Sequence, residues 1–333
     1  MNLISQLIFN SWYGKSSITY VLLPFSLLYW VMIQVRILVY KMGILPQFEV
    51  GVPVIVVGNL TVGGTGKTPL VIQLVRILVD EGFSPGILSR GYKSKMPIFP
   101  HLIEGNESAF TVGDEPLLLH EQTGRPVMID PDRVRGGREL IKQCGVDIII
   151  SDDGLQHTRL SRSIEIIVVD GNRRFGNNCL LPAGPLRESA KHLNKAHFIV
   201  ANGGTAFSGE YQMKTTVGDA VRLIDGECKM LSDFICKKVH AIAGIGNPAP
   251  FFSCLKETGI DIDIHSFSDH HSYRPSDLKA LNSATVLMTA KDAIKCRDFA
   301  GSDWWAVRQI IELDDRFRIA FLEAIKKQIG NNG

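Results

Sequence analysis

The sequence predicts an α/β protein, built from a doubly wound sheet, a second, smaller α/β domain and an N-terminal membrane-associated helix. Three observations lead to this fold class. Short β-branched runs alternate with segments of helical spacing along most of the 333 residues, a glycine-rich loop follows the first run, and an uncharged apolar segment precedes it. We expect three parts, which are the N-terminal segment 1–45, a larger domain over 46–205 and a smaller domain over 206–333.

The N-terminal apolar segment contains no charged residue between positions 20 and 35. A membrane-crossing helix needs about 20 apolar residues, so this run is slightly short unless Arg36 reaches the headgroups. The aromatic residues in and before it suit a membrane interface: Trp12, Tyr13, Tyr29 and Trp30. A helix buried in the protein core is the alternative. We expect a helix that lies in or on a membrane.

The larger domain is predicted from a regular alternation of strands and helices. The first strand covers residues 52–57 (VPVIVV), a β-branched run typical of a buried parallel strand. Helices are expected over 69–81 and 133–144. Further strands are expected at 86–89, 127–130, 146–151, 164–170 and 197–201. This rhythm is that of a doubly wound sheet.

The smaller domain is expected to follow a turn-rich stretch over residues 201–211. A helix over 316–329 would close it. Its strands are predicted at 239–245, 260–267, 284–289 and 304–310.

The strongest functional signal is the loop TVGGTGKT, which lies between the first strand and the first helix of the larger domain. Backbone N–H groups of such a loop wrap phosphate oxygens, and the helix N-terminus adds its positive end. The context predicts a P-loop NTPase fold, in which Lys67 reaches the phosphates and Thr68 holds Mg²⁺. The predicted nucleotide-binding residues of this loop are Thr61, Val62, Gly63, Gly64, Thr65, Gly66, Lys67 and Thr68.

Acidic residues are expected beside this loop, because P-loop enzymes hold their metal with a carboxylate at the end of another strand. Asp152 and Asp153 follow the strand over 146–151 and meet that requirement. In the segment PAGPLRE, Arg187 offers positive charge for phosphate and Glu188 a further metal contact. Helix caps and turns are the structural alternatives for these segments.

A base for an acceptor hydroxyl can be sought among the remaining carboxylates. Asp114 is a candidate, with His270 or His271 as the partner that orients it. Taken alone, Asp114 is more often a turn or helix-cap residue. The paired histidines also fit a metal site, but the sequence shows no third ligand at a suitable spacing. The segment TAKD resembles a nucleotide-base loop, with Lys291 and Asp292 as its charged residues.

Composition excludes several classes of protein. The net charge is only +2, without a Lys/Arg-rich arm, so no nucleic-acid partner is expected. The six cysteines are scattered without a CxxC pair, which argues against a disulfide framework or zinc site and favours a reducing cytosol.

Taken together, these motifs resemble the tetraacyldisaccharide 4'-kinase family, which adds the 4'-phosphate in lipid A biosynthesis. The resemblance covers most of the chain, and the order of its motifs is specific. Besides the loop and TAKD, the matching segments are GNL at 58–60, SRGY at 89–92, GDEP at 113–116, DDGLQH at 152–157, PAGPLRE at 182–188, GIGNP at 244–248 and DHH at 269–271. Thr61 departs from the general P-loop pattern but resembles the loop of this family.

The resemblance implies a kinase on the cytoplasmic face of the inner membrane. ATP and Mg²⁺ would bind at the P-loop, and the lipid disaccharide would enter between the domains, beside membrane lipids. Asp114 would act as base with a histidine, preferably His270, while Asp152, Asp153 and Glu188 would surround the metal. Phosphoryl transfer depends mainly on positioning and charge, which suits a site assembled by domain closure.

Two rival functions remain open at this level. A membrane-bound P-loop NTPase switch or assembly factor would need no acceptor base, so a pairing of Asp114 with His270 would argue against it. A soluble kinase of a small metabolite is opposed by the apolar N-terminal segment.

Overall fold

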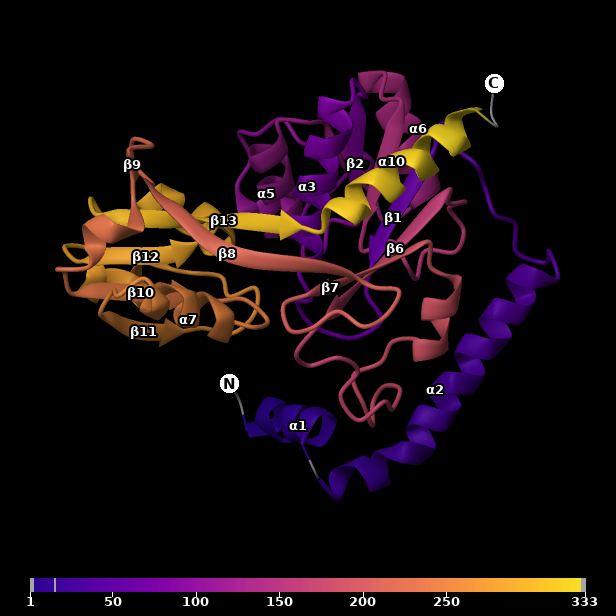
Figure 1. The fold of residues 1–333 in the computed structure, drawn as a ribbon, viewed down its shortest axis with the longest axis horizontal. Helices are drawn as coiled ribbons and strands as arrows, with labels where there is room; N and C mark the ends of the chain where they lie inside the picture. Colours follow the sequence, from indigo (N-terminus) through magenta and orange to yellow (C-terminus); the bar gives the residue numbers. More distant parts are fainter. Residues whose placement is uncertain (1–2, 15, 331–333) are drawn as a thin grey trace.

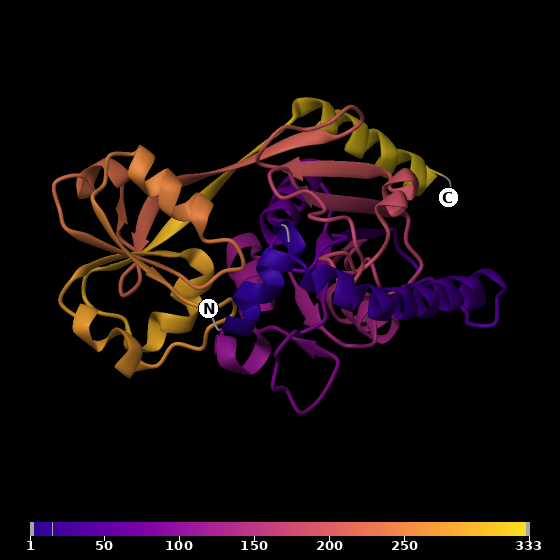
Figure 2. The ribbon, with the colours of Figure 1, turned by 90° about the horizontal axis from the view of Figure 1, so that it is seen from below.

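The computed structural model of the protein describes residues 3–14 and 16–330. Two α/β halves lie side by side, and two long strands pass between them (Figures 1 and 2). Within the described residues, 13 strands form one sheet, in the order β11-β10-β12-β13-β8-β7-β6-β1-β5-β2-β4-β3, with β9 paired to β8. The doubly wound α/β architecture is confirmed. The division of the chain at 45/46 and 205/206 stays a prediction.

The first half contains seven strands among the described residues, and most of them are parallel and apolar. They are β1 (Val54–Gly58), β2 (Pro85–Ser89), β3 (His101–Leu102), β4 (Val127–Ile129), β5 (Ile148–Asp152), β6 (Ile164–Asp170) and β7 (Phe198–Asn202). Strand β1 lies between β5 and β6, with Val57 beside Asp152. The carboxyl ends of β1 and β5 therefore meet at one edge, where ligands bind in open α/β sheets.

Helices cover both faces of this part of the sheet. Helices α3 (Lys67–Asp80) and α5 (Asp114–Thr123) pack on one face, α6 (Arg133–Cys144) packs on the other, and α4 (Ala109–Val112) and η1 (Ala190–Lys195) are short. Helix α3 buries Leu70, Leu74 and Leu78 completely, because residues four apart share one helix face. Each leucine contributes roughly 1.5–3 kcal/mol of burial free energy, which fixes α3 and the loop that precedes it.

The second half is a smaller α/β layer around β10, β11, β12 and β13. Its strands are β8 (Tyr211–Arg222), β9 (Cys228–Lys229), β10 (Val239–Ala243), β11 (Ile262–Ser266), β12 (Thr285–Thr289) and β13 (Trp304–Leu313). Its helices are η2 (Leu231–Phe234), α7 (Ala249–Glu257), α8 (Pro275–Leu278), η3 (Lys279–Leu281), α9 (Ala290–Cys296) and η4 (Arg297–Phe299). Every strand expected from the sequence is present within a few residues of its expected bounds.

Besides the two-residue strands β3 and β9, which were not expected, two larger features differ from the sequence-based expectation. Strand β8 was not expected; it pairs parallel with β7 and antiparallel with β13, and so joins the two halves into one sheet. Helix α10 (Asp315–Gly330) was expected to close the second half. Instead, its residues Phe317, Phe321 and Ile325 are buried in the core of the first half, where Phe317 packs edge-on against Phe198.

The N-terminal helices α1 (Leu3–Tyr13) and α2 (Ile18–Lys41) lie along the outside of the first half (Figure 1). Of the helices described, α2 alone is long and apolar enough to cross a membrane, and 6% of its apolar window is buried. Its contacts with the body are polar: Ser26 donates to Leu180 O at 2.8 Å and Tyr29 donates to Arg187 O at 3.1 Å. Arg36 is exposed, and its guanidinium donates to Gln156 O. The core-helix alternative is therefore excluded.

Candidate active site

A cavity of about 680 Å³ lies between the two halves and collects most of the residues selected from the sequence. The P-loop lines it from Val62 to Pro69, and the second half contributes residues that follow its own strands, among them Ile245, His270 and Lys291. Thr61 lies outside the lining, where it bridges to Leu186. The cavity is thus built from carboxyl-terminal strand ends of both halves.

The P-loop keeps its shape through contacts that need a glycine at position 66. Gly66 has φ of +93°, and a Cβ atom there would lie 2.2 Å from Asn202 Nδ2. That amide donates to Thr65 O at 3.1 Å, while Thr215 donates to Asn202 Oδ1 at 3.2 Å. Only glycine meets both the left-handed backbone and the close approach. The first turn of α3 is thereby held open toward the cavity, where N–H groups bind anions.

Lys67 and the acidic pair lie together at the floor of the cavity. Lys67 Nζ donates to Asn59 Oδ1 at 3.2 Å and lies 3.3 Å from Asp153 Oδ1. Arg187 Nη1 contacts both carboxylate oxygens of Asp153 at 3.3 Å. Burial alone would raise the pKa of Asp153, but Lys67 and Arg187 outweigh it and lower that pKa. Asp153 therefore stays ionised between two cations.

Asp152 has a different environment from its neighbour. Its side chain is buried at the end of β5, and its Oδ1 atom has no hydrogen-bond partner among the residues described. Burial, followed by the carboxylate of Glu115, raises its pKa well above the ordinary value. A buried carboxylate with a free oxygen is costly unless a cation completes it. Because Asp152 and Thr68 line the same cavity, this oxygen set fits a hard divalent cation.

Asp114 and His270 are brought together from the two halves. His270 Nδ1 lies 2.9 Å from each carboxylate oxygen of Asp114, and Lys291 Nζ lies 3.9 Å from Asp114 Oδ2. Burial would raise the pKa of Asp114, but the His270 hydrogen bond and the Lys291 charge lower it to about 2. His270 has φ of +54°, a rare conformation outside glycine that is found at functional sites.

His271 is separated from this pair. Its Nε2 atom lies 3.3 Å from Asp277 Oδ2, and its ring packs against Phe267 and Tyr273. Of the two histidines considered from the sequence, only His270 contacts Asp114 among the described residues.

The two residues of the TAKD segment lie in different places. Lys291 lines the cavity, bonds Glu115 Oε1 at 2.9 Å and lies 3.4 Å from His270 Nε2. Asp292 is fully buried behind it, where it accepts bonds from Gly244 N and Tyr273 and pairs with Lys295. Its side chain fixes the loops that carry the site and is not part of the cavity wall.

Glu188 is also drawn away from the cavity wall. His192 Nδ1 bonds Glu188 Oε2 at 2.7 Å, and His192 Nε2 bonds Glu165 Oε1 at 2.9 Å. Hydrogen bonds from both carboxylates raise the pKa of His192 to about 9, so it is a cation between them. Glu188 as a metal ligand stays a prediction, and it requires this pairing to open.

Several polar cavity residues had no role assigned from the sequence, among them Arg90, Tyr92, Arg133 and Asn202. Arg133 is buried and donates to Asp152 O at 2.7 Å, while its Nε and Nη1 atoms find no partner within residues 3–14 and 16–330. Burial lowers its pKa to about 10, and burial with Arg133 and Arg90 lowers that of His157 to about 4. The unpaired guanidinium nitrogens of Arg133 therefore make this side of the cavity suitable for binding an anion. The sequence signal that could have identified Arg133 is its position shortly after the expected strand over 127–130.

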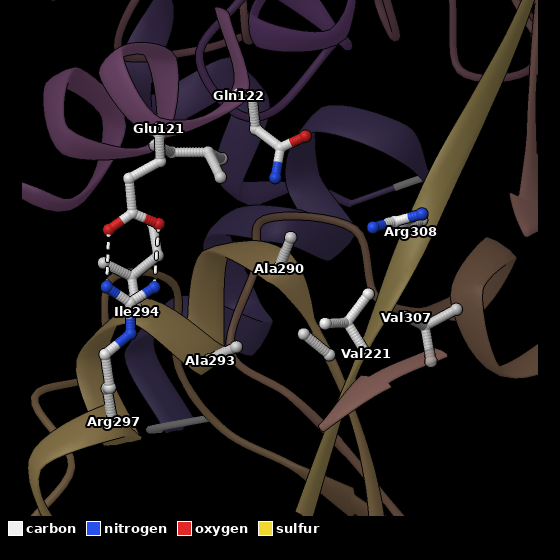
Figure 3. A pocket seen from close by; sticks show the side chains of 11 residues that line it. Glu121, Gln122, Val221, Ala290, Ala293, Ile294, Arg297, Val307 and Arg308 are labelled. Carbon is white, nitrogen blue, oxygen red and sulfur yellow. Dashed lines mark hydrogen bonds and ion pairs between the residues drawn. The ribbon is translucent and has the colours of Figure 1, made fainter. Parts of the chain in front are cut away.

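A second, smaller pocket of about 220 Å³ lies between α5, α9, β8 and β13 (Figure 3). Beside it, Arg297 and Glu121 form a two-pronged ion pair with N–O distances of 2.7 and 2.8 Å. The pair joins α5, which begins at Asp114, to the segment after α9, which carries Lys291. It therefore links the helix of Asp114 to the helix of Lys291, whose Nζ atom lies 3.4 Å from His270 Nε2.

The fold and the site define a P-loop nucleotide-binding enzyme. A parallel strand leads into a glycine-rich loop and a helix, a neighbouring strand ends in two aspartates, and an aspartate–histidine pair stands across the cavity. The chain belongs to the tetraacyldisaccharide-1-P 4'-kinase family, whose sequence model matches residues 18–326.

Relatives and a solved structure agree with this assignment. The tetraacyldisaccharide 4'-kinase of Actinobacillus pleuropneumoniae serotype 7 is 44% identical over 96% of this chain and 99% of its own. The tetraacyldisaccharide 4'-kinase of Methylobacillus flagellatus is 43% identical over 92% of this chain and 91% of its own. The crystal structure of LpxK from Aquifex aeolicus, an "apo" form in complex with ATP, superposes with a TM-score of 0.77. It is 30% identical and covers 92% of this chain and 99% of its own.

Proposed function

We propose that this chain transfers the γ-phosphoryl group of ATP to the 4'-hydroxyl of a tetraacyl disaccharide 1-phosphate, in the lipid A pathway. The observation that carries the proposal is the Asp114–His270 pair, which is held at 2.9 Å beside the cavity that the P-loop lines. Family membership supports the same activity.

Asp114 is the proposed base. Its carboxylate is ionised at neutral pH and takes the proton of the 4'-hydroxyl as the oxygen bonds to the γ-phosphorus. The bond from the γ-phosphorus to the bridging oxygen breaks, and ADP leaves. His270 orients the carboxylate and is held in turn by Lys291 and Tyr92. Lys67 and Arg187 stabilise the charge that spreads over the transferred group.

Mg²⁺ is the proposed metal. The oxygens of Thr68, Asp152 and Asp153 fit it, because one buried oxygen of Asp152 lacks a partner among the described residues. Glu188 would join them after release from His192. When bound, the ion would offset the negative charge of the phosphates. Lys291 would lie along the nucleotide base after leaving Glu115 and His270, which it contacts in this structure, and Asp292 supports that loop from behind.

The cytoplasmic face of the inner membrane is the proposed location. Helix α2 directs exposed apolar side chains such as Leu27 and Leu28 away from the body, while Ser26 and Tyr29 fasten its other side to residues 180–187. A helix bonded along one side and apolar along the other suits the membrane surface better than a span. The lipid substrate would then reach the cavity from the bilayer, and no nucleic acid is needed.

The experiment is transfer of labelled γ-phosphate from ATP to a tetraacyl disaccharide 1-phosphate in detergent. We expect Asp114→Ala and His270→Ala to slow transfer by roughly 10²–10⁴-fold, the usual contribution of a positioned base. His271→Ala is the matched control and should transfer normally. Hydrolysis of ATP without labelled lipid in the unmodified protein would instead favour a membrane-bound NTPase switch.

A further inference from the structure

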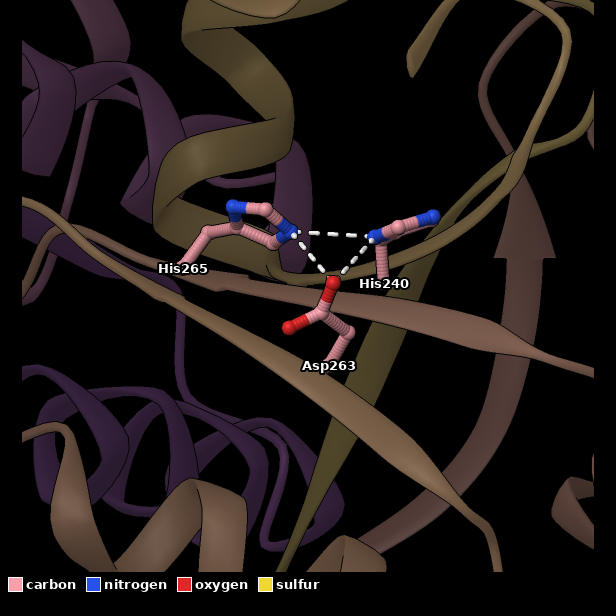
Figure 4. A group of neighbouring side chains, drawn as sticks. All are labelled: His240, Asp263 and His265. Atoms are coloured by element: carbon pink, nitrogen blue, oxygen red, sulfur yellow. Dashed lines mark hydrogen bonds and ion pairs between the residues drawn. The ribbon is translucent and has the colours of Figure 1, made fainter. Parts of the chain in front are cut away.

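Three potential metal ligands lie together on the two outer strands of the second half. His240 is on β10, and Asp263 and His265 are on β11, the outermost strand of the sheet. In the parallel register His240 is opposite Asp263, and His265 follows two residues later on the same face. Figure 4 shows two ring nitrogens and one carboxylate oxygen turned toward one another.

The distances among these three atoms match a metal site. His240 Nδ1 lies 3.0 Å from His265 Nε2 and 3.3 Å from Asp263 Oδ2, and the latter two atoms are 3.7 Å apart. The point equidistant from the corners of such a triangle lies about 2 Å from each. That is the usual length of Zn–N and Zn–O bonds, about 2.0–2.2 Å.

Hydrogen bonds alone explain the convergence less well. His240 Nδ1 carries either one proton or one lone pair, so it can satisfy only one of its two neighbours, His265 Nε2 or Asp263 Oδ2. The 3.7 Å separation of these two neighbours exceeds hydrogen-bond length. A cation uses the lone pairs of all three atoms at once. The ligand set of two imidazoles and one carboxylate selects transition metals over Mg²⁺ or Ca²⁺.

We propose that His240, Asp263 and His265 bind one divalent transition-metal ion of the Zn²⁺ class. The side chain of Asp263 is 54% exposed on the outermost strand, so solvent reaches the ion and water completes its coordination. The site is separate from the cavity: His240 lies near the amino end of β10, whereas the cavity residues Ile245 and Gly246 follow its carboxyl end. Bound metal would cross-link β11, which leads to His270, to β10.

The test is calorimetric titration of the full chain in detergent with ZnCl₂, after removal of metal with a chelator. We expect binding of one ion, weakened at least tenfold in His265→Ala and in the isosteric Asp263→Asn. Asp261→Asn removes a charge from an exposed residue just before β11 and is the matched control with unchanged binding. Replacement by Co²⁺ should give visible absorption bands that both site variants lose.

The variants chosen lie on the exposed outer strand, so circular dichroism should show their folds intact. Zn²⁺ binding of equal strength in Asp263→Asn and His265→Ala would place the ion elsewhere and overturn the proposal. Failure of the unmodified chain to bind Zn²⁺ would do the same, leaving three hydrogen-bonded side chains. Neither result bears on the kinase activity, which the lipid transfer assay measures separately.

Discussion

At the scale of single residues, the ionisation of Asp114 governs both the proposed chemistry and a measurable part of stability. Its folded-state pKa of about 2 lies below the ordinary value of 3.8. The stabilising contribution of the ionised group is therefore complete above pH 3.8 and is lost as the pH falls through about 2. We expect Asp114→Asn to lower the unfolding midpoint by a constant amount from neutral pH down to about pH 4, with a smaller deficit below pH 3.

Thermal unfolding of the unmodified protein and of Asp114→Asn, measured across that pH range, tests this prediction. Asp261→Asn is the matched control, because Asp261 is exposed just before β11 and should cost little. A stability deficit that disappears near pH 5 would mean that the pKa of Asp114 is not depressed.

The sequence predicts the position of a candidate site residue best where the local chain alone places its side chain. The P-loop, Asp152 and Asp153 follow strands directly, so sequence order fixed their position at the sheet edge. Asp292 and Glu188 were harder, since each is a short carboxylate near the cavity that pairs with a distant partner. Lys295 and His192 decide their orientation, and nothing in the local motifs specifies those pairings.

At the scale of elements, α2 depends on one buried polar contact. Ser26 donates to Leu180 O and accepts from Ala183 N at 3.0 Å. Ser26→Ala would leave the buried Ala183 N unpaired, while Leu180 O keeps its bond from Gly184 N at 2.9 Å, and we expect a loss of about 1–3 kcal/mol of unfolding free energy. Chemical denaturation measures this difference in unfolding free energy. Ser17→Ala is the control, because Ser17 is exposed and makes no side-chain cap bond.

The outer side of α2 gives a separate prediction. Leu27 and Leu28 are more than half exposed, at 63% and 61%. Replacing both with glutamine should weaken binding to phospholipid vesicles without reducing the unfolding free energy, because apolar surface drives interfacial binding. Flotation with vesicles measures the first and denaturation the second. Unchanged flotation would show that α2 is not the membrane contact.

Strand β8 shows why one element escaped sequence analysis. Its apolar positions alternate at Tyr211, Met213 and Val217, but Met213 is buried while much of the strand is half-exposed between the halves. Gly218 interrupts the pattern further. The alternation of apolar and polar residues that marks a strand was therefore present but weak. The pairing of β8 with β7 and β13 depends on how the whole chain folds, which the local sequence does not specify.

At the scale of the whole molecule, the two halves are joined by β8 and β13 and meet again at the P-loop. Helix α10 returns to the first half and packs on Phe198, so the chain crosses between the halves twice. The Asp114–His270 pair exists only while this arrangement is closed, since each half supplies one partner. The family resemblance predicted that these partners would meet, whereas local motifs alone could not, because the two residues are 156 positions apart.

The backbones of the two halves come close at Gly246, which faces Gly64 of the P-loop. A Cβ atom on Gly246 would lie 2.9 Å from Gly64 N and 3.1 Å from Asp269 Oδ2. Gly246 lies outside the left-handed region, so alanine fits the local backbone and the strain falls on the contact between halves. We expect Gly246→Ala to separate Asp114 from His270 and to lower kcat at least about tenfold, or about 1.4 kcal/mol.

Steady-state kinetics with the lipid acceptor, together with small-angle scattering for the overall dimensions, measure this effect. Gly330→Ala, at the open end of α10, is the control and should behave as the unmodified protein. A larger radius of gyration with intact unfolding stability would assign the loss to the contact between halves rather than to misfolding. If Gly246→Ala keeps full kcat, the halves need not approach this closely during phosphoryl transfer, and the pairing of Asp114 with His270 must tolerate a wider opening.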